Sequence, residues 1–337
     1  MSRHPVLVTR RLPGLVMDRL GLYCDVTCWT GEGAMPRDEL LSAAEGCHAI
    51  ITLLTERVDA ELLERAGRDL RLVANYAVGL DNVDIAACTS RSVMVSNTPD
   101  VLTEATADMA WALLMAAARR VAEGDRLLRS AQPWLWGPET MLGQDVFGRT
   151  LGIIGLGRIG RAVGRRAVGH GMRVVFHSRG HAPHERVPLR EDGSSPAESM
   201  SLDELLQVAD FVSLHVNLDE GTHHLIGRRQ LSLMKDTAVL VNTSRGAVLD
   251  EEALADALDD GTIFAAGLDV FEREPEISPR LLAQPRAVLC PHLGSATLDT
   301  RVAMGMVAVD NVIAALRGER PPTLANETAW DRRRRLA

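Results

Sequence analysis

The sequence predicts an α/β protein with two doubly wound parallel-sheet domains, one flavodoxin-like and one of the Rossmann type. Short apolar runs alternate with helix-like stretches along most of the 337 residues, and a glycine-rich fingerprint lies near the middle of the chain. Alternating strands and helices are typical of a parallel sheet covered by helices on both faces. The central position of the fingerprint indicates that one domain is inserted into the other.

The first predicted α/β unit extends from Val6 to Asn97. Helix-start residues, Pro36 and Asp59, precede two of its helices. Its strands are short apolar runs without a glycine fingerprint, at residues 6–8, 24–28, 49–53, 72–74 and 93–95.

A stretch rich in Ala, Leu and Met follows Pro99 and predicts one long helix from Thr103 to Arg129. Its apolar residues cover most of the helix circumference, which is more than one buried face requires. We therefore expect this helix to lie between layers or against a partner chain, as a hinge and dimer element.

The second predicted unit begins at Thr150. Residues 158–169 and 250–258 have helical patterns, and residues 180–201, rich in Pro, Ser and charge, are expected to form a long exposed connection. The strands are predicted at residues 151–154, 173–176, 211–214, 238–241, 263–266 and 287–289.

Composition excludes several classes of function. The net charge of -8 offers no broad basic face for nucleic acid or an anionic membrane. The five cysteines form no CxxC pair and no Cys/His cluster with zinc spacing, so we predict free thiols and no metal site. The N-terminus has no signal-peptide pattern, and the apolar stretch at 109–118 is too short to span a bilayer. We expect a cytoplasmic protein without a membrane partner.

The fingerprint Gly155-Leu156-Gly157-Arg158-Ile159-Gly160 predicts a dinucleotide site, because it follows a predicted strand and opens a predicted helix. The first glycine makes the tight turn, the second admits the pyrophosphate, and the third lets helix and strand pack closely. We expect residues 100–292 to form the dinucleotide-binding domain. Residues 1–99 and 293–337 would form a discontinuous substrate-binding domain, with the active-site cleft between the two.

The end of the next strand distinguishes NADP from NAD. An acidic residue there would bind the ribose 2′-hydroxyl of NAD, but the chain has Ser178 and Arg179 instead. Both side chains can donate hydrogen bonds to a 2′-phosphate. The sequence thus favours NADP(H) and leaves NAD(H) possible, since Arg179 could also be a solvated loop residue.

Three later segments place reactive side chains just after predicted strands, where ligands bind in open α/β sheets. The side chains on these three segments are Arg245, the acidic pair Glu272 and Glu274, and His292. Each residue could instead have a structural role: Arg245 as a partner of a helix C-cap, Glu274 as a carboxylate that interacts with a helix dipole, and His292 as a buried core histidine. Composition alone does not choose between Glu272 and Glu274.

These segments resemble the D-isomer-specific 2-hydroxyacid dehydrogenase family, and within it the glyoxylate/hydroxypyruvate reductases. The resemblance extends from about residue 6 to residue 322 and rests on segments 75–82, 97–100, 106–108, 243–246 and 291–296, in the family's order. It implies reduction of a small 2-oxo acid by hydride transfer and a homodimer. D-lactate/pyruvate, 3-phosphoglycerate or phosphite as substrate, and a non-catalytic NAD(H)-sensing protein, remain alternatives.

The resemblance also implies roles for individual residues. Arg245 would hold the substrate carboxylate and polarise its 2-oxo group, and His292 would act as acid and base with Glu274 as its partner, raising its pKa. The backbone N–H groups of Val78 and Gly79 would complete the substrate site. The implied cofactor-binding residues are Thr106, Leu156, Gly157, Arg158, Ile159, Ser178, Arg179, His215, Val216, Thr222, Thr243, Ser244, Arg245, Asp269, His292 and Gly294.

Two segments qualify the resemblance. Where the family has His-x-Pro, this chain has His215-Val216-Asn217, which puts the ribose contacts in doubt. Trp134 and Trp136 lie in a segment that, in the reductases, crosses to the partner subunit and lines its pocket. Trp136 is therefore a candidate substrate-binding residue, with packing of a crossover loop or dimer interface as the alternative.

Overall fold

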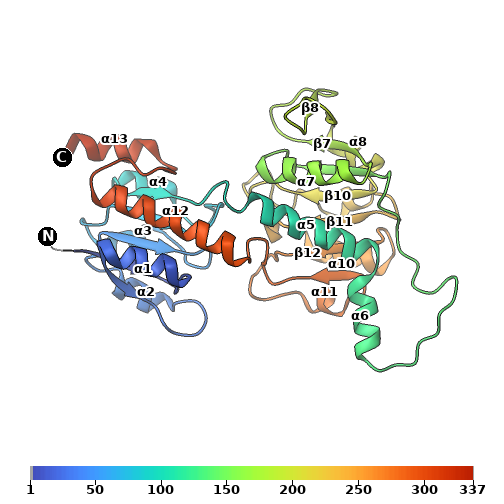
Figure 1. Cartoon of the computed structure of the whole chain (residues 1–337), viewed down its shortest axis with the longest axis horizontal. Helices are drawn as coiled ribbons and strands as arrows, with labels where there is room; N and C mark the ends of the chain where they lie inside the picture. Colours follow the sequence, from blue (N-terminus) through green and yellow to red (C-terminus); the bar gives the residue numbers. More distant parts are fainter. Residues whose placement is uncertain (1–2, 337) are drawn as a thin grey trace. The chain divides into compact units, whose positions relative to one another are not determined.

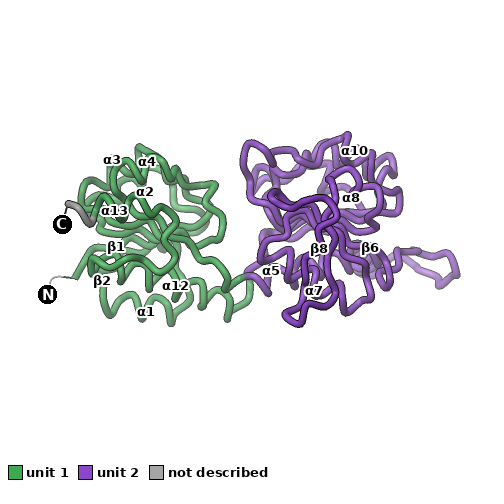
Figure 2. Tube along the Cα trace, turned by 90° about the horizontal axis from the view of Figure 1, so that it is seen from above, with its two compact units in different colours: residues 1–102, 296–337 green, residues 103–295 purple. Residues whose placement is uncertain are grey.

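The computed structural model describes the backbone of residues 3–336 and the side chains of residues 3–333. The chain divides into two compact units, Met1–Leu102 with Ala296–Ala337 (unit 1) and Thr103–Ser295 (unit 2) (Figure 2). The two boundaries lie three residues beyond those expected from the sequence, at 102 instead of 99 and at 295 instead of 292.

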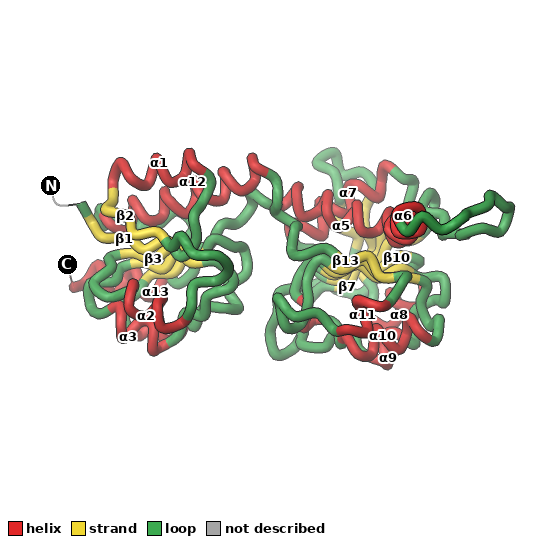
Figure 3. The backbone as a smooth tube through the Cα atoms, turned by 90° about the horizontal axis from the view of Figure 1, so that it is seen from below, coloured by secondary structure: helices red, strands yellow, loops and turns green. Residues whose placement is uncertain are grey.

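Unit 1 has a five-stranded parallel sheet in the order β2-β1-β3-β4-β5. This is the flavodoxin-like order of a doubly wound sheet. Its strands are β1 (His4–Val8), β2 (Cys24–Cys28), β3 (Ala49–Thr52), β4 (Leu72–Asn75) and β5 (Met94–Ser96). Its helices are α1 (Gly14–Tyr23), α2 (Arg37–Ala43), α3 (Ala60–Ala66), α4 (Ile85–Ser90), α12 (Leu298–Leu316) and α13 (Glu327–Leu336), which cover both faces of the sheet (Figure 3).

Unit 2 has an eight-stranded sheet in the order β13-β12-β11-β10-β6-β7-β9-β8. All pairs are parallel except β8 with β9, so the fold class predicted from the sequence is confirmed. The strands are β6 (Thr150–Ile154), β7 (Arg173–His177), β8 (Arg186–Pro188), β9 (Pro196–Ser199), β10 (Phe211–Leu214), β11 (Val239–Asn242), β12 (Ala265–Leu268) and β13 (Ala287–Leu289). The helices are α5 (Thr103–Ala118), α6 (Val121–Arg129), α7 (Arg158–Gly169), α8 (Leu202–Val208), α9 (Arg228–Leu231), α10 (Glu251–Asp259) and α11 (Pro279–Ala283), with a 3-10 turn η1 (Gly246–Val248).

The prediction of one long helix from Thr103 to Arg129 is wrong. The stretch is two helices, α5 and α6, separated at Arg120, whose backbone is left-handed with φ of 54°. Helix α5 packs between α7 and strands β11 and β12, as its apolar circumference requires, whereas α6 buries none of its residues. Figure 1 shows α6 and the loop that follows it standing away from the body of unit 2.

The expected exposed connection at residues 180–201 is also corrected, because it contains strands β8 and β9. Strand β9 pairs in parallel with β7 and so forms the third strand of a Rossmann order, β9-β7-β6-β10-β11-β12. Its sequence, Pro-Ala-Glu-Ser, has no apolar run, and only Ala197 and Ser199 are buried. Position in the sheet therefore overrides the weak strand propensity of these residues.

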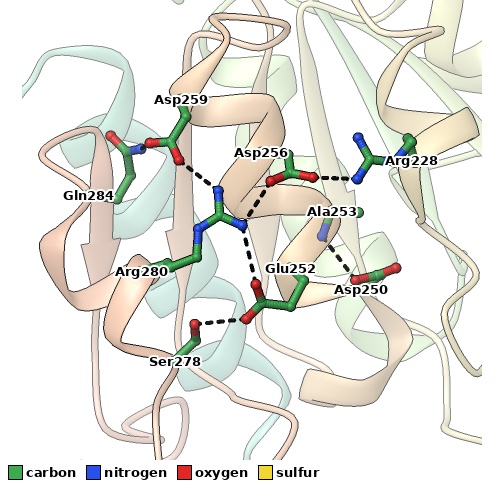
Figure 4. Close-up of polar contacts among 9 residues, drawn as sticks. All are labelled: Arg228, Asp250, Glu252, Ala253, Asp256, Asp259, Ser278, Arg280 and Gln284. Atoms are coloured by element: carbon green, nitrogen blue, oxygen red, sulfur yellow. Dashed lines mark hydrogen bonds and ion pairs between the residues drawn. The ribbon is translucent and has the colours of Figure 1, made fainter.

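Helices α10 and α11 are joined by a network of charges around Arg280 (Figure 4). The Arg280 guanidinium donates to Asp256 at 2.8 Å, to Asp259 at 2.7 Å and to Glu252 at 3.2 Å. Hydrogen bonds to these three carboxylates raise the pKa of Arg280. The network holds α11, which lies between β12 and β13 in the chain, against α10.

The contact between α5 and the sheet depends on Gly267 in β12. A Cβ atom at this position would lie 2.8 Å from the Leu113 Cβ and 3.1 Å from its carbonyl oxygen. We expect Gly267→Val to lower the free energy of unfolding by about 1–3 kcal/mol, because Leu113 is buried and cannot move freely. Gly169→Ala on α7, with nothing within 4 Å, is the control and should not destabilise the protein. Urea unfolding of both variants tests this, and equal stabilities would contradict it.

Candidate active site

The fingerprint glycines form a turn between β6 and α7 that is shaped by close backbone contacts. Gly155 has a φ of 97°, and a Cβ there would lie 2.6 Å from the His215 carbonyl oxygen. A Cβ on Gly160 would lie 2.2 Å from the carbonyl oxygen of Gly155. Both positions therefore require glycine.

The N-terminus of α7 fits the phosphates of a dinucleotide. Gly157 is its N-cap, no side chain caps it, and a Cβ on Gly157 would meet nothing within 4 Å. The first N–H groups of the helix thus face open space that an anion can approach. Of the other fingerprint residues, Leu156 is buried in the core, Ile159 packs against it, and Arg158 is exposed.

The loop after β10 carries His215, Val216 and Thr222, which the family resemblance places near the ribose and phosphates. Burial lowers the pKa of His215 to about 3, and its ring contacts the Ser213 hydroxyl through Nε2 at 2.8 Å. The Thr222 hydroxyl donates to the Asn217 carbonyl at 2.7 Å and accepts the Asp219 N–H at 2.8 Å. These contacts close the loop on itself, so a proline after His215 is not needed to hold its shape.

Ser178 and Arg179 follow β7, as predicted. The Arg179 side chain is 75% exposed and forms an ion pair with Asp219 at 2.6 Å. The hydrogen bond from Arg179 lowers the pKa of Asp219. Arg179 therefore has a carboxylate partner that sequence reasoning did not anticipate, and any 2′-phosphate would compete with it.

Strands β11, β12 and β13 are neighbours in the sheet and parallel, so their carboxyl ends share one edge. Arg245, Asp269 and His292 each follow one of these strands. Segments that are far apart in the chain are thus brought to the edge where open α/β sheets bind ligands.

Glu274 and His292 are in direct contact. The Glu274 Oε2 atom lies 2.8 Å from His292 Nδ1, and the two side chains are only 27% and 28% exposed. Burial alone would raise the pKa of Glu274, but the hydrogen bond with His292, the Phe271 N–H and the charges of His292 and Arg245 lower it overall. The carboxylate is therefore ionised near neutral pH.

The structure distinguishes the two glutamates between which composition alone could not choose. Glu272 does not pair with His292 but contacts His224, with 3.1 Å between Oε1 and Nε2. Glu274 also accepts the Phe271 N–H at 2.9 Å, which turns its carboxylate back across the loop. The geometry thus selects Glu274 as the partner of His292.

Asp269 holds the turn that presents His292. Its carboxylate accepts the N–H groups of Leu293 at 2.6 Å and Gly294 at 2.7 Å, and its carbonyl accepts that of His292 at 2.9 Å. Burial raises the pKa of Asp269, although the two backbone hydrogen bonds act in the opposite direction. Thr106 lies beside the same turn, since a Cβ on Gly294 would be 3.5 Å from its hydroxyl.

Arg245 extends from a loop that the Asn242 side chain holds in place. The Asn242 side chain donates to the Arg245 carbonyl at 2.8 Å and accepts from the Ser244 N–H at 3.0 Å and hydroxyl at 2.8 Å. The Thr243 hydroxyl is buried without a partner among the described residues. The half-buried guanidinium of Arg245 donates to the Ser244 carbonyl at 2.8 Å.

Gly246 is a residue of this site that sequence reasoning missed. A Cβ there would lie within 2.2 Å of the backbone of Phe271 and Glu272, so only glycine allows the Arg245 loop to approach the Glu274 segment. The Thr-Ser-Arg-Gly sequence was the available signal, but it does not reveal which backbone the glycine approaches.

The remaining predicted residues lie elsewhere. In unit 1, the carbonyls of Val78 and Gly79 accept hydrogen bonds from Asn97 at 2.8 Å and Asn75 at 2.9 Å, which fixes the loop after β4. In unit 2, the Trp136 side chain is 78% exposed on the loop after α6. Within the described part of the chain, no helix is both long and apolar enough to cross a membrane.

Comparison with known proteins identifies the family. Residues 111–294, more than half of the chain, match the model of the D-isomer specific 2-hydroxyacid dehydrogenase NAD binding domain. The chain belongs to the D-isomer specific 2-hydroxyacid dehydrogenase family. It is 48% identical over 327 residues to a glyoxylate reductase of Thermococcus gammatolerans, with 96% of each chain covered.

Solved structures agree with this assignment. The TT0316 protein of Thermus thermophilus superposes with a TM-score of 0.87 at 46% identity, covering 95% of this chain and 99% of that one. An NADPH-dependent glyoxylate/hydroxypyruvate reductase of Sinorhizobium meliloti, solved with NADP and malonate, has a TM-score of 0.81 at 32% identity, covering 97% and 98%. This family member is thus an NAD(P)-dependent oxidoreductase that reduces a 2-oxo acid.

Proposed function

We propose that this dehydrogenase reduces glyoxylate or hydroxypyruvate to the corresponding D-2-hydroxy acid, with NADPH preferred over NADH. The observation that carries the proposal is the Glu274–His292 pair at the sheet edge that also bears Arg245. The names of the relatives, several of them glyoxylate reductases, support the choice of substrate.

In this proposal Arg245 binds the substrate anion. Its planar guanidinium can hold a carboxylate oxygen and the 2-oxo oxygen together, which withdraws electrons from the carbonyl carbon. The backbone N–H groups of Val78 and Gly79 would hold the carboxylate further. The bound nicotinamide cofactor supplies the hydride.

His292 would give its proton to the oxygen that becomes the hydroxyl group. Because its Nδ1 atom faces Glu274, Nε2 is the nitrogen that would donate. The Glu274 carboxylate stabilises the imidazolium form and fixes the ring orientation. Asp269 acts through the backbone, since it holds the turn on which His292 lies.

The proposed cofactor site uses the uncapped N-terminus of α7 for the pyrophosphate. Around it we place the backbone of Leu156, Arg158 and Ile159. The other proposed contacts are Thr106, His215, Val216, Thr222, Thr243, Ser244, Asp269 and Gly294, with Ser178 and Arg179 at the 2′-phosphate.

We further propose a homodimer in which the loop after α6 contacts the partner subunit. Large apolar side chains are exposed on this part of the chain: Val121, Leu128, Trp134, Leu135, Trp136 and Leu142. A monomer rarely exposes so many neighbouring apolar groups. Trp136 would then be available to line a substrate pocket.

The function is tested by following NADPH and NADH oxidation with a panel of 2-oxo acids that includes glyoxylate, hydroxypyruvate, pyruvate and 3-phosphohydroxypyruvate. We expect the highest kcat/KM with glyoxylate or hydroxypyruvate. A preference for another acid would overturn the substrate proposal. Cofactor binding without turnover of any acid would indicate a sensing role instead.

Glu274→Gln should lower kcat by about 10²- to 10⁴-fold, because the imidazolium loses its carboxylate partner. Glu276→Gln removes an exposed carboxylate two residues further on and is the control. Activity profiles across pH for both variants test the pairing, and unchanged kinetics in Glu274→Gln would refute it.

Cofactor choice should depend on Arg179 and its partner Asp219. Removing Arg179 with Ala deletes a charge-assisted hydrogen bond and should lower kcat/KM for NADPH about 10- to 100-fold, with little effect on NADH. Asp219→Asn removes the competing carboxylate and should raise the NADPH-to-NADH ratio of kcat/KM. If Arg179→Ala affects both cofactors equally, Arg179 does not contact the 2′-phosphate.

A further inference from the structure

Unit 2 has a group of three potential metal ligands that shares no residue with the Glu274–His292 pair. One ligand atom from each of His223, His224 and Glu272 lies within 4.8 Å of the other two. The closest pair is His224 Nε2 and Glu272 Oε1, at 3.1 Å. The sequence predicted no metal site, because Glu272 is distant in the chain and adjacent histidines do not have a recognised ligand spacing.

The backbone conformation explains how the adjacent side chains of His223 and His224 lie on the same side of the chain. In an extended chain, neighbouring side chains point to opposite sides. His224, however, has a φ of 48°, in the left-handed region that few residues other than glycine adopt. As a result, the His223 and His224 rings stack, with centroids 4.1 Å apart and planes inclined by 27°.

Backbone hydrogen bonds hold all three residues in place. The His223 N–H donates to the Asp219 carbonyl at 3.0 Å, and the His224 N–H donates to the Ala247 carbonyl at 2.8 Å. The Glu272 N–H donates to the Glu251 carboxylate at 2.6 Å. A metal ion would therefore meet ligands whose main chains are already ordered, which lowers the cost of binding.

The donor types and spacing suit zinc. With zinc–nitrogen and zinc–oxygen bonds of about 2.0–2.1 Å, the donor atoms of a tetrahedral site lie roughly 3.3 Å apart. The His224–Glu272 distance of 3.1 Å is close to this value. The His223 donor atom lies within 4.8 Å of both of these atoms, and its ring is exposed and not held in place by burial.

We propose that His223, His224 and Glu272 bind one divalent transition-metal ion of the zinc class, with water at the fourth position. Imidazole nitrogens and a carboxylate are a common ligand set for Zn²⁺. The ion would link the loop between β10 and α9 to the segment after β12 that carries Glu274. This inference does not depend on the proposed substrate or cofactor.

The test is calorimetric titration of tag-free, chelator-treated protein with ZnCl₂. We expect one equivalent to bind the wild type at micromolar concentrations and to raise its Tm. His223→Ala and Glu272→Gln should each weaken binding at least about tenfold, since each removes a ligand. The matched control is His181→Ala/His184→Ala, which removes two other histidines that contact carboxylates, Glu185 and Glu198.

Two results would overturn the proposal. One is the absence of zinc binding to the wild type below millimolar concentration. The other is binding of equal strength in the wild type and in both ligand variants, which would place the ion elsewhere, for example on cysteine thiols. The visible absorption of bound Co²⁺ provides a second readout, because it reports ligand number independently of stability. The Tm of each metal-free variant shows that the fold is intact.

Discussion

The carboxylate of Asp269 provides the interaction on which the site depends. The residue is 1% exposed, and it accepts the N–H groups of Leu293 and Gly294 while its carbonyl accepts that of His292. These bonds hold His292 at a φ of 55°, a conformation that costs energy for a residue other than glycine. Without this carboxylate, the turn that carries His292 would lose two of its three hydrogen bonds to Asp269.

Close backbone contacts then join this turn to the other two segments. Gly246 lets the Arg245 loop pack on the backbone of Phe271 and Glu272, and the Phe271 N–H holds Glu274. Arg280 joins α11 to three carboxylates of α10, which holds the later part of the chain between β12 and β13. Main-chain contacts and the side chains of Asp269 and Arg280 therefore position the segments, and the Glu274–His292 hydrogen bond then orients the imidazole.

The sequence could predict those features that depend on the residues of a single segment. Most strands were predictable because a buried strand requires a run of apolar residues. The fingerprint was predictable because a close approach between backbones requires glycine at that position. Strand β9 was not, because its pairing with β7 depends on the sheet and not on its own residues. The break at Arg120 was missed because helix propensity continues across it, and the choice of Glu274 over Glu272 depends on which histidine each one faces in space.

Electrostatics adds a further constraint, since a chain with a net charge of -8 must bind an anionic cofactor and an anionic substrate. The N-terminus of α7 offers positive potential without a charged side chain. Arg179 and His292, by contrast, each have a carboxylate partner, Asp219 and Glu274. The two pairs differ in what the carboxylate does. In the proposed mechanism Glu274 stabilises the positive charge of His292, whereas Asp219 would have to release Arg179 before a 2′-phosphate could bind. In the proposed NADP(H) complex, Asp219 and the 2′-phosphate would compete for the Arg179 guanidinium, so cofactor preference would depend on Asp219 as well as on Arg179.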